Sequence, residues 1–234
     1  YLTDPVEHAT DPGTATIEAM EHHILLVEPK HKKALTAELS NREGRTVVFV
    51  RTKLGADRVA LQLREAGVFA AALHGGLNQG QRSRVLEAFK EGRIPVLVAT
   101  DVAARGLHVD DVTAVIQVDP PADHKDYLHR AGRTARAGAG GTVVTLALPH
   151  QRRGMTRLAE AAGIDIRPVS ATPSDPSLQE STGASDPSGV PVSEETLRRM
   201  VERPVRASGP RWGGRADRSG RSDRPARSTG GAPR

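Results

Sequence analysis

The sequence contains no cysteine. Disulfide bonds and metal sites built from thiolates are therefore excluded, and a reducing compartment is compatible with the chain. No apolar run approaches the roughly 18–20 residues that a membrane-spanning helix needs. Residues 1–20 also lack the basic start and the apolar block of a secretory signal peptide. We therefore expect a soluble, cytoplasmic protein that makes no membrane contact.

The net positive charge of the chain is concentrated at its end. The 234 residues carry a formal net charge of +5. Residues 204–234 contain eight arginines and two aspartates, a net charge of +6, which leaves −1 for residues 1–203. A polyanionic partner is therefore indicated for the tail, whereas any function of the body has to come from its motifs.

Strand and helix patterns alternate between residues 22 and 162. The run 46–50 is rich in valine, which is typical of a strand buried on both faces of a parallel sheet. Gly67 follows the helical pattern 54–66 as a carboxyl-terminal cap. The expected strands are 22–27, 46–50, 68–73, 94–99, 112–118 and 141–148, and the expected helices are 32–39, 54–66, 81–89, 123–128 and 150–162. This alternation predicts an α/β fold, a three-layer sandwich with a mostly parallel central sheet.

Composition divides the chain into four parts. They are an extended lead-in at 1–21, the α/β domain at 22–165, a Ser/Pro-rich linker at 166–203, and a disordered Arg/Gly/Ser-rich basic tail at 204–234. The chain starts at Tyr1 without a methionine, so we expect a domain to be missing before it, although processing would leave the same start. Residues 168–192 of this linker are too polar to order themselves. Residues 191–201 could hold one short helix capped by Ser193.

Several loops are expected to meet at one functional edge of the sheet, because ligands of such sheets lie at the carboxyl ends of the strands. The loops on this edge follow Val50, Leu73, Ala99 and Val118. Gly75 and Gly76 let the backbone of the second loop approach a ligand closely, and exposed amides there suit phosphate oxygens. A plain tight turn explains the two glycines equally well.

The loop after Ala99 carries further groups suited to phosphate. Thr100 can donate its hydroxyl and its amide to a phosphate oxygen. Asp101 can orient Arg105 or another cation. A helix cap at Thr100 or Asp101 is the alternative for the start of this loop, but it does not explain Arg105 and Gly106 at its end.

Residues 127–138 contain His129 and three arginines spaced by three residues. On a helix or in a tight turn, residues three apart share a face, so Arg133 and Arg136 can point at one ligand. Guanidinium is the fork that fits phosphate. The alternative is a solvated, basic end of a helix.

Four segments together resemble the carboxyl-terminal-half motifs of DEAD-box RNA helicases of the bacterial type. The segments are Val47-Val48-Phe49-Val50-Arg51-Thr52-Lys53, His74-Gly75 with Gln79 and Arg82, Ala99-Thr100-Asp101-Val102-Ala103-Ala104-Arg105-Gly106, and His129-Arg130-Ala131-Gly132-Arg133-Thr134-Ala135-Arg136. They occur in the order of the family, and the resemblance covers residues 22–162.

This resemblance implies the second RecA-like domain of an ATP-dependent RNA helicase. It makes Arg133 and Arg136 arginine fingers that reach the terminal phosphate of ATP across a cleft between two domains, and it makes His129 a residue that couples those domains. It places a track for the RNA backbone at Thr52, Gly75, Gln79, Arg82, Thr100, Arg105 and Gly106. Such contacts go to phosphate and sugar and carry little sequence information.

The sequence also departs from the family pattern. His108 stands where many members have an aspartate that touches the nucleotide ribose, and it is either a ribose contact or a surface histidine. No phosphate-binding loop of the type G-x-x-x-x-G-K-[ST] and no Asp-Glu-Ala-Asp segment is present. We therefore expect ATP with Mg²⁺ as cofactor, the metal held by a missing amino-terminal RecA-like domain, and no activity from this chain alone.

The tail is expected to bind RNA through Arg211, Trp212 and Arg215. Arginines would bind phosphates with release of counterions, and the indole would stack on a base. A tail that only keeps the protein soluble is the alternative. We expect a monomer whose partners are RNA and the amino-terminal domain. The alternative for the whole chain is a stand-alone RNA-binding or regulatory module without ATPase activity.

Overall fold

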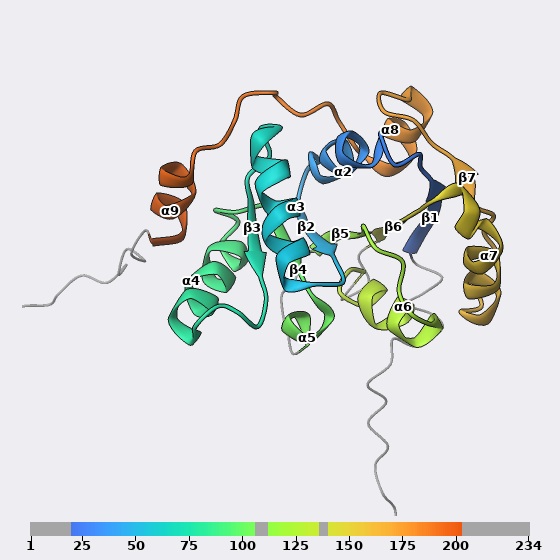
Figure 1. Ribbon diagram of the computed structural model, residues 1–234, viewed down its shortest axis with the longest axis horizontal. Helices are drawn as coiled ribbons and strands as arrows, with labels where there is room; N and C mark the ends of the chain where they lie inside the picture. Colours follow the sequence, from blue (N-terminus) through green and yellow to red (C-terminus); the bar gives the residue numbers. More distant parts are fainter. Residues whose placement is uncertain (1–19, 106–111, 136–139, 203–234) are drawn as a thin grey trace, which may run out of the picture. The chain divides into compact units, whose positions relative to one another are not determined.

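The computed structural model describes residues 20–105, 112–135 and 140–202. Helices and strands alternate along these ranges (Figure 1). In chain order they are β1 (Met20–Leu26), α2 (Lys32–Ser40), β2 (Arg45–Phe49), α3 (Lys53–Glu65), β3 (Ala70–Leu73), α4 (Gln79–Lys90), β4 (Val96–Ala99), α5 (Asp101–Ala104), β5 (Val112–Gln117), α6 (His124–Ala131), β6 (Gly141–Ala147), a 3-10 turn (Pro149–Gln151), α7 (Arg152–Ala161), β7 (Val169–Ser170), α8 (Pro176–Thr182) and α9 (Glu194–Glu202). No helix within the described ranges is both long and apolar enough to span a membrane.

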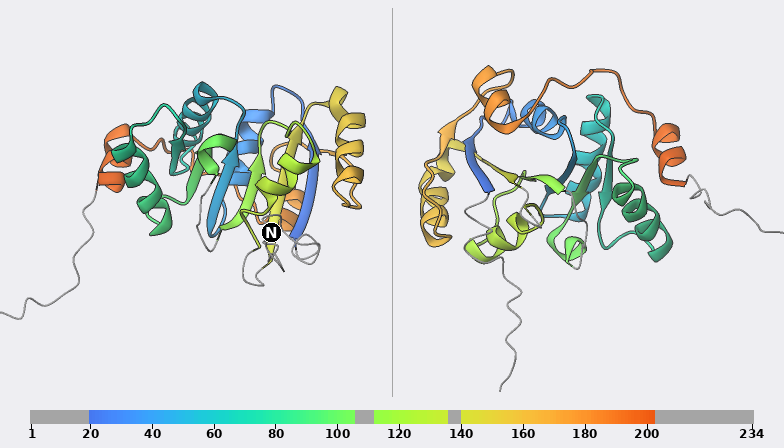
Figure 2. Two further views of the ribbon diagram at one scale, coloured as in Figure 1. Left: turned by 90° about the horizontal axis from the view of Figure 1, so that it is seen from below. Right: turned by 180° about the vertical axis from the view of Figure 1, so that it is seen from behind.

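The strands of the described residues form one seven-stranded sheet with the order β3-β4-β2-β5-β6-β1-β7. Every neighbouring pair in this sheet is parallel (Figure 2). At the carboxyl ends, Phe49 of β2 is level with Ala99 of β4, which is level with Leu73 of β3. Three loops of the predicted functional edge therefore leave the sheet at the same height.

Both faces of the sheet are covered by helices, as the valine-rich run in β2 predicts. Val47 and Phe49 point into the cluster under α4, α5, α6 and α7, whereas Val48 and Val50 point into the cluster under α2, α3 and α8. Alternation of side chains along a strand sends successive residues to opposite faces. The predicted three-layer α/β fold is confirmed.

The ends of several elements differ from the sequence prediction by a few residues. Helix α4 begins at Gln79 rather than at residue 81, because Asn78 and Gln81 form a reciprocal capping box that starts the helix earlier. Helix α6 continues to Ala131, beyond the predicted end at residue 128.

The prediction that residues 168–192 do not order themselves is wrong. Strand β7 adds to the edge of the sheet by pairing with β1. Leu178 of α8 is buried in the cluster beneath α2, and both carboxylate oxygens of Glu38 accept the amide of Ser174 at 3.0–3.1 Å. This segment orders because the α/β domain supplies the apolar surface that the segment itself lacks.

Helix α9 is the short helix that the sequence predicts, and it lies beside α4 (Figure 1). The hydroxyl of Ser193 accepts the amide of Thr196 and caps the helix. Leu197 is 8% exposed and packs into the cluster beneath α4, a burial worth about 1.5–3 kcal/mol for leucine. Arg64 of α3 donates to the Glu194 carboxylate at 3.1 Å and fixes the other end of the contact.

Candidate nucleotide and RNA site

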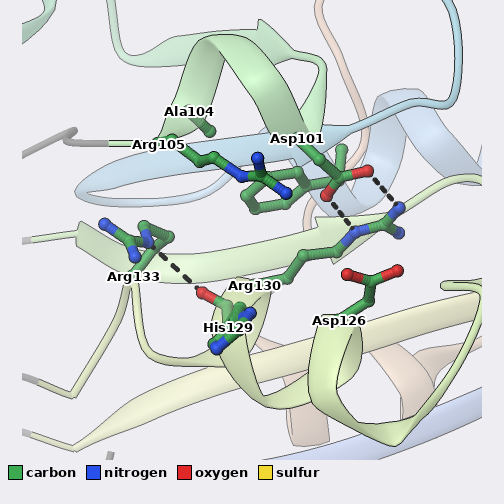
Figure 3. Close-up of a pocket in the computed structure, with 8 residues that line it drawn as sticks. Asp101, Ala104, Arg105, Asp126, His129, Arg130 and Arg133 are labelled. Atoms are coloured by element: carbon green, nitrogen blue, oxygen red, sulfur yellow. Dashed lines mark hydrogen bonds and ion pairs between the residues drawn. The ribbon is translucent and has the colours of Figure 1, made fainter. Parts of the chain in front are cut away.

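An open cleft of about 390 Å³ lies at the carboxyl edge of the sheet, between β2, α5 and α6. Figure 3 shows Arg105 on the α5 side and His129 and Arg133 on the α6 side of the same space. The lining residues are Phe49, Asp101, Ala104, Arg105, Asp126, His129, Arg130 and Arg133. The cleft thus brings a residue of the predicted RNA track together with two residues of the predicted ATP motif.

Arg130 is the buried centre of this cleft. Its Nε and Nη2 donate to the two carboxylate oxygens of Asp101 at 2.6 and 2.8 Å, a bidentate pair. Nη1 donates to the backbone carbonyl of Asp119 at 2.8 Å and to Gln117 Oε1 at 3.3 Å. The guanidinium carbon lies 5.3 Å from the ring centre of Phe49, a cation–π distance. All of these partners belong to the protein, so Arg130 has a structural role.

The sequence pattern did not separate Arg130 from the other arginines in its stretch. Asp101 was expected to orient Arg105 or another cation, and the structure shows that this cation is Arg130. Asp101 and Arg130 belong to two different motifs. The sequence therefore gives no sign of their ion pair, which only the fold shows.

Helix α6 is held in place at its amino-terminal end and near its middle. Asp123 caps it, and its carboxylate accepts the amide of Asp126 at 2.9 Å. This hydrogen bond lowers the pKa of Asp123 below its usual value, so the cap contributes stability at neutral pH that is lost as the pH falls through the lowered pKa. The buried Tyr127 hydroxyl lies 2.8 Å from His22 Nδ1 of β1, and burial raises the pKa of Tyr127.

Arg133 lies in the turn that follows α6, not on the helix itself. Its Nε donates to the backbone carbonyl of His129 at 3.3 Å, and its side chain lines the cleft. The turn is anchored by Thr134, a buried residue whose hydroxyl donates to the carbonyl of Val112. Ala135 has a positive φ of 54°, which is uncommon for a residue other than glycine.

Gly141, the first residue of β6, lies close against this turn. A Cβ at this position would come within 2.4 Å of Thr134 Oγ1 and 2.8 Å of the Ala135 amide nitrogen. Gly141→Ala should therefore destabilise the protein by about 1–3 kcal/mol, the usual cost of overpacking. Urea unfolding measures the change.

A matched control for this substitution is Gly154→Ala in α7, where a Cβ meets no atom within 4 Å. Alanine stabilises a helix interior by about 1 kcal/mol relative to glycine, so the same change should have the opposite sign there. Equal effects at the two glycines would contradict the close fit of Gly141 to the turn.

The predicted RNA-track residues of the described chain lie on the loops and helix starts of the same edge. Thr52 caps α3, and its Oγ1 accepts the amide of Gly55 at 3.0 Å, which leaves the hydroxyl hydrogen for another acceptor. Gly75 and Gln79 are exposed. These residues expose groups that suit a phosphate backbone.

Two other track residues are partly committed to the protein. Thr100 is buried, and its amide donates to the carbonyl of Leu73 at 3.4 Å. From the sequence we expect this amide to donate to a phosphate, but the bond to Leu73 already occupies it. Arg82 is half-buried, and its Nη2 donates to the carbonyl of Ala103 at 2.7 Å. This bond joins α4 to α5, and it is the one hydrogen bond that the Arg82 guanidinium makes within the described residues.

The remaining predicted site residues lie outside the described residues. They are Gly106, His108, Arg136, Arg211, Trp212 and Arg215. Lys53 belongs to the first motif segment, but the sequence prediction gave it no role. Its side chain lies against Gly75. Its position directly after Thr52 is the sequence feature that could have marked it as a site residue.

Comparison with known proteins adds the family. Residues 30–138 match the model of the helicase conserved C-terminal domain. The ATP-dependent rRNA helicase RRP3 of Eremothecium gossypii is 40% identical over 164 residues, which are 69% of this chain and 34% of that protein. This chain therefore spans about a third of the length of that relative.

Solved structures of DEAD-box proteins are also similar to this chain. The crystal structure of the E. coli DEAD-box protein SrmB bound to RraA is 37% identical, with a TM-score of 0.57 over 67% of this chain and 95% of that chain. The C-terminal domain of the DEAD-box protein Dbp5 is 28% identical, with a TM-score of 0.61 over 70% of this chain and 96% of that chain. The predicted RecA-like fold is confirmed, and this chain belongs to the DEAD-box family as its helicase C-terminal domain.

Proposed function

We propose that this chain is the carboxyl-terminal half of an ATP-dependent RNA helicase that unwinds short duplexes locally. The observation that carries the proposal is the cleft, where Arg105 of the RNA-track loop lies beside His129 and Arg133. In this assignment Arg133 and Arg136 act on the terminal phosphate of ATP, and His129 couples the two domains. RNA and ATP would then bind to neighbouring side chains at the carboxyl edge of the sheet.

The donor set of the cleft fits a polyphosphate. The negative charge of Asp101 is compensated by Arg130, which leaves the guanidinium groups of Arg105 and Arg133 facing the cleft with one further carboxylate, Asp126. ATP, when bound, supplies the phosphoanhydride bond that is hydrolysed. The arginines of this chain would stabilise charge that develops on the terminal phosphate. His108 would offer a hydrogen bond to the ribose.

The magnesium ion of the proposal is assigned to the amino-terminal domain. Within the described residues, no group of three or more His, Cys, Asp or Glu side chains could hold a metal ion. Assignment of the metal to the partner domain follows from the resemblance alone.

The RNA partner is proposed to bind through its phosphates and sugars. Thr52, Gly75, Gln79, Arg82 and Arg105 would contribute from the described part of the chain, together with Thr100 through its hydroxyl. Gly106 and the tail residues Arg211, Trp212 and Arg215 would extend the contact. The tail carries a net charge of +6, which supports a sequence-tolerant and salt-dependent contribution.

The remaining parts of the proposal concern the complete protein. An amino-terminal RecA-like domain of the same protein would be its partner across the cleft, and the protein would act as a cytoplasmic monomer of the bacterial type. The parallel strand order and the family membership support the proposal that this chain is one half of an ATPase. The alternative of a stand-alone RNA-binding module has no observation of its own in its favour.

The RNA part of the proposal is tested through Arg105, which is exposed and lines the cleft. Arg105→Ala in the complete protein should raise the RNA concentration for half-maximal stimulation of ATP hydrolysis roughly tenfold, the effect of losing one charge-assisted hydrogen bond. ATPase assays over a range of RNA concentrations measure it. Arg153→Ala, an exposed arginine on α7, is the control. An unchanged RNA requirement in Arg105→Ala would contradict the proposed track.

A further inference from the structure

Lys53, the first residue of α3, lies over the backbone of Gly75. A Cβ on Gly75 would be 3.5 Å from Lys53 Cε and 3.8 Å from Lys53 Nζ, so the end of the lysine side chain lies within van der Waals contact of that position. Both residues are exposed. The lysine ammonium therefore lies next to the glycine backbone that the RNA track includes, and directly beside the track residue Thr52.

The charge of Lys53 is not neutralised within the described part of the chain, where it has no carboxylate within ion-pair distance. Asp57 is its natural partner, because residues four apart are neighbours on a helix. However, the Oδ1 of Asp57 lies 2.9 Å from His74 Nε2. His74 thus holds the carboxylate that would otherwise pair with Lys53.

His74 is held from two sides. Its side chain is 8% exposed, and its Nδ1 accepts the amide of Gly76 at 3.1 Å. A ring nitrogen that accepts carries no hydrogen, so the hydrogen of the neutral ring is on Nε2, which donates to Asp57. One imidazole therefore fixes both the glycine loop and the Asp57 carboxylate.

Helix stability does not account for a lysine at this position. The first turn of α3 contains no acidic residue. A cation in the first turn is unfavourable because the amino-terminal end of a helix carries partial positive charge. An anion bound at this point would remove that cost.

We propose that Lys53 is a further RNA-binding residue that contacts a backbone phosphate, and that His74 and Asp57 are positioning residues which keep its ammonium available above Gly75. This inference rests on the proposed function and extends its RNA track. A lysine there supplies a point charge without base recognition, so the contact is independent of sequence.

The first test is Lys53→Ala in the complete protein, with affinity for an unstructured single-stranded RNA oligonucleotide measured by fluorescence anisotropy at several salt concentrations. Affinity should fall roughly two- to fivefold, the range for an exposed ion pair. The slope of log affinity against log salt should become less negative by about 0.7, the value for one phosphate on a single strand. Lys90→Ala, an exposed lysine at the opposite end of α4, should change neither quantity. An unchanged affinity and slope in Lys53→Ala overturns the proposal.

The second test separates positioning from folding. His74→Asn retains an acceptor near the place of Nδ1 but cannot reach Asp57, so Asp57 is released toward Lys53 and RNA affinity should fall as in Lys53→Ala. Adding Asp57→Asn removes the competing charge, and the double variant should regain most of the affinity. A double variant that binds as weakly as His74→Asn overturns the positioning role, because a purely structural defect is not repaired by a neutral partner.

The outcome also distinguishes this inference from the proposed function. If Arg105→Ala weakens RNA binding but Lys53→Ala does not, the RNA track stands without Lys53. If neither substitution weakens binding, the proposed track itself is wrong.

Discussion

Arg133→Ala is expected to lower RNA-stimulated ATP hydrolysis by the complete protein by about 10³-fold, the smaller effect seen for loss of an arginine finger. RNA binding should persist, because Arg133 lies on the α6 side of the cleft and not on the RNA-track loops. The physical reason is that a guanidinium stabilises negative charge mainly when that charge develops on the phosphate, and contributes less to binding of the ground state.

The measurement is ATP hydrolysis at saturating RNA, together with RNA affinity measured separately. Arg133→Lys keeps the charge but loses the planar fork, and should recover only part of the rate. Arg136→Ala should behave in the same way if the two arginines act on one phosphate, as the sequence spacing predicts. Arg153→Ala is again the control. Retained hydrolysis in Arg133→Ala would remove the finger role and leave Arg133 as a surface cation.

Arg130→Met is expected to destabilise the fold by about 3 kcal/mol. Loss of one partner from a buried pair typically costs about 3–5 kcal/mol, because the other charge remains without compensation. The lower value applies because the side chain of Asp101 is 36% exposed and solvent screens part of its charge, whereas the Arg130 side chain is 5% exposed. Urea unfolding measures the change in the free energy of unfolding.

The double variant Arg130→Met with Asp101→Leu sharpens this result. Removing both charges leaves neither one uncompensated, so the double variant should be more stable than Arg130→Met alone. Arg133→Ala in the same unfolding series should change stability by less than about 0.5 kcal/mol, as expected for a side chain that is only half-buried at an open cleft. Equal destabilisation by Arg130→Met and Arg133→Ala would contradict the structural role of Arg130.

The sequence predicted the fold well where packing and pattern agree. The run 46–50 is buried on both faces, and such a strand has to lie inside a parallel sheet covered by helices, so one short segment indicated the whole architecture. Helix ends were less accurate at α4, since a capping box between Asn78 and Gln81 started that helix before its apolar pattern begins.

The sequence failed for residues 168–192 for a different reason. Composition measures whether a segment can bury enough apolar surface by itself, and this segment cannot. It orders against α2 and β1, where Glu38 accepts the Ser174 amide and Leu178 enters an existing core. Contacts with a domain already formed are invisible to a compositional argument.

By itself, the sequence determined that this chain is an α/β domain that carries the motifs of the DEAD-box family at one edge, because hydrophobic period and motif order are local properties of the chain. Only the tertiary structure showed which of the clustered cations is committed to partners within the protein. Arg130 and Arg133 are three residues apart and chemically identical, and both line the cleft, yet Arg130 is buried in an ion pair with Asp101 whereas Arg133 is only half-buried. Lys53 likewise gained its proposed role from Gly75 and His74, which are distant in sequence. The partners that neutralise or leave exposed each of these cations come from separate loops, and only the fold brings those loops together.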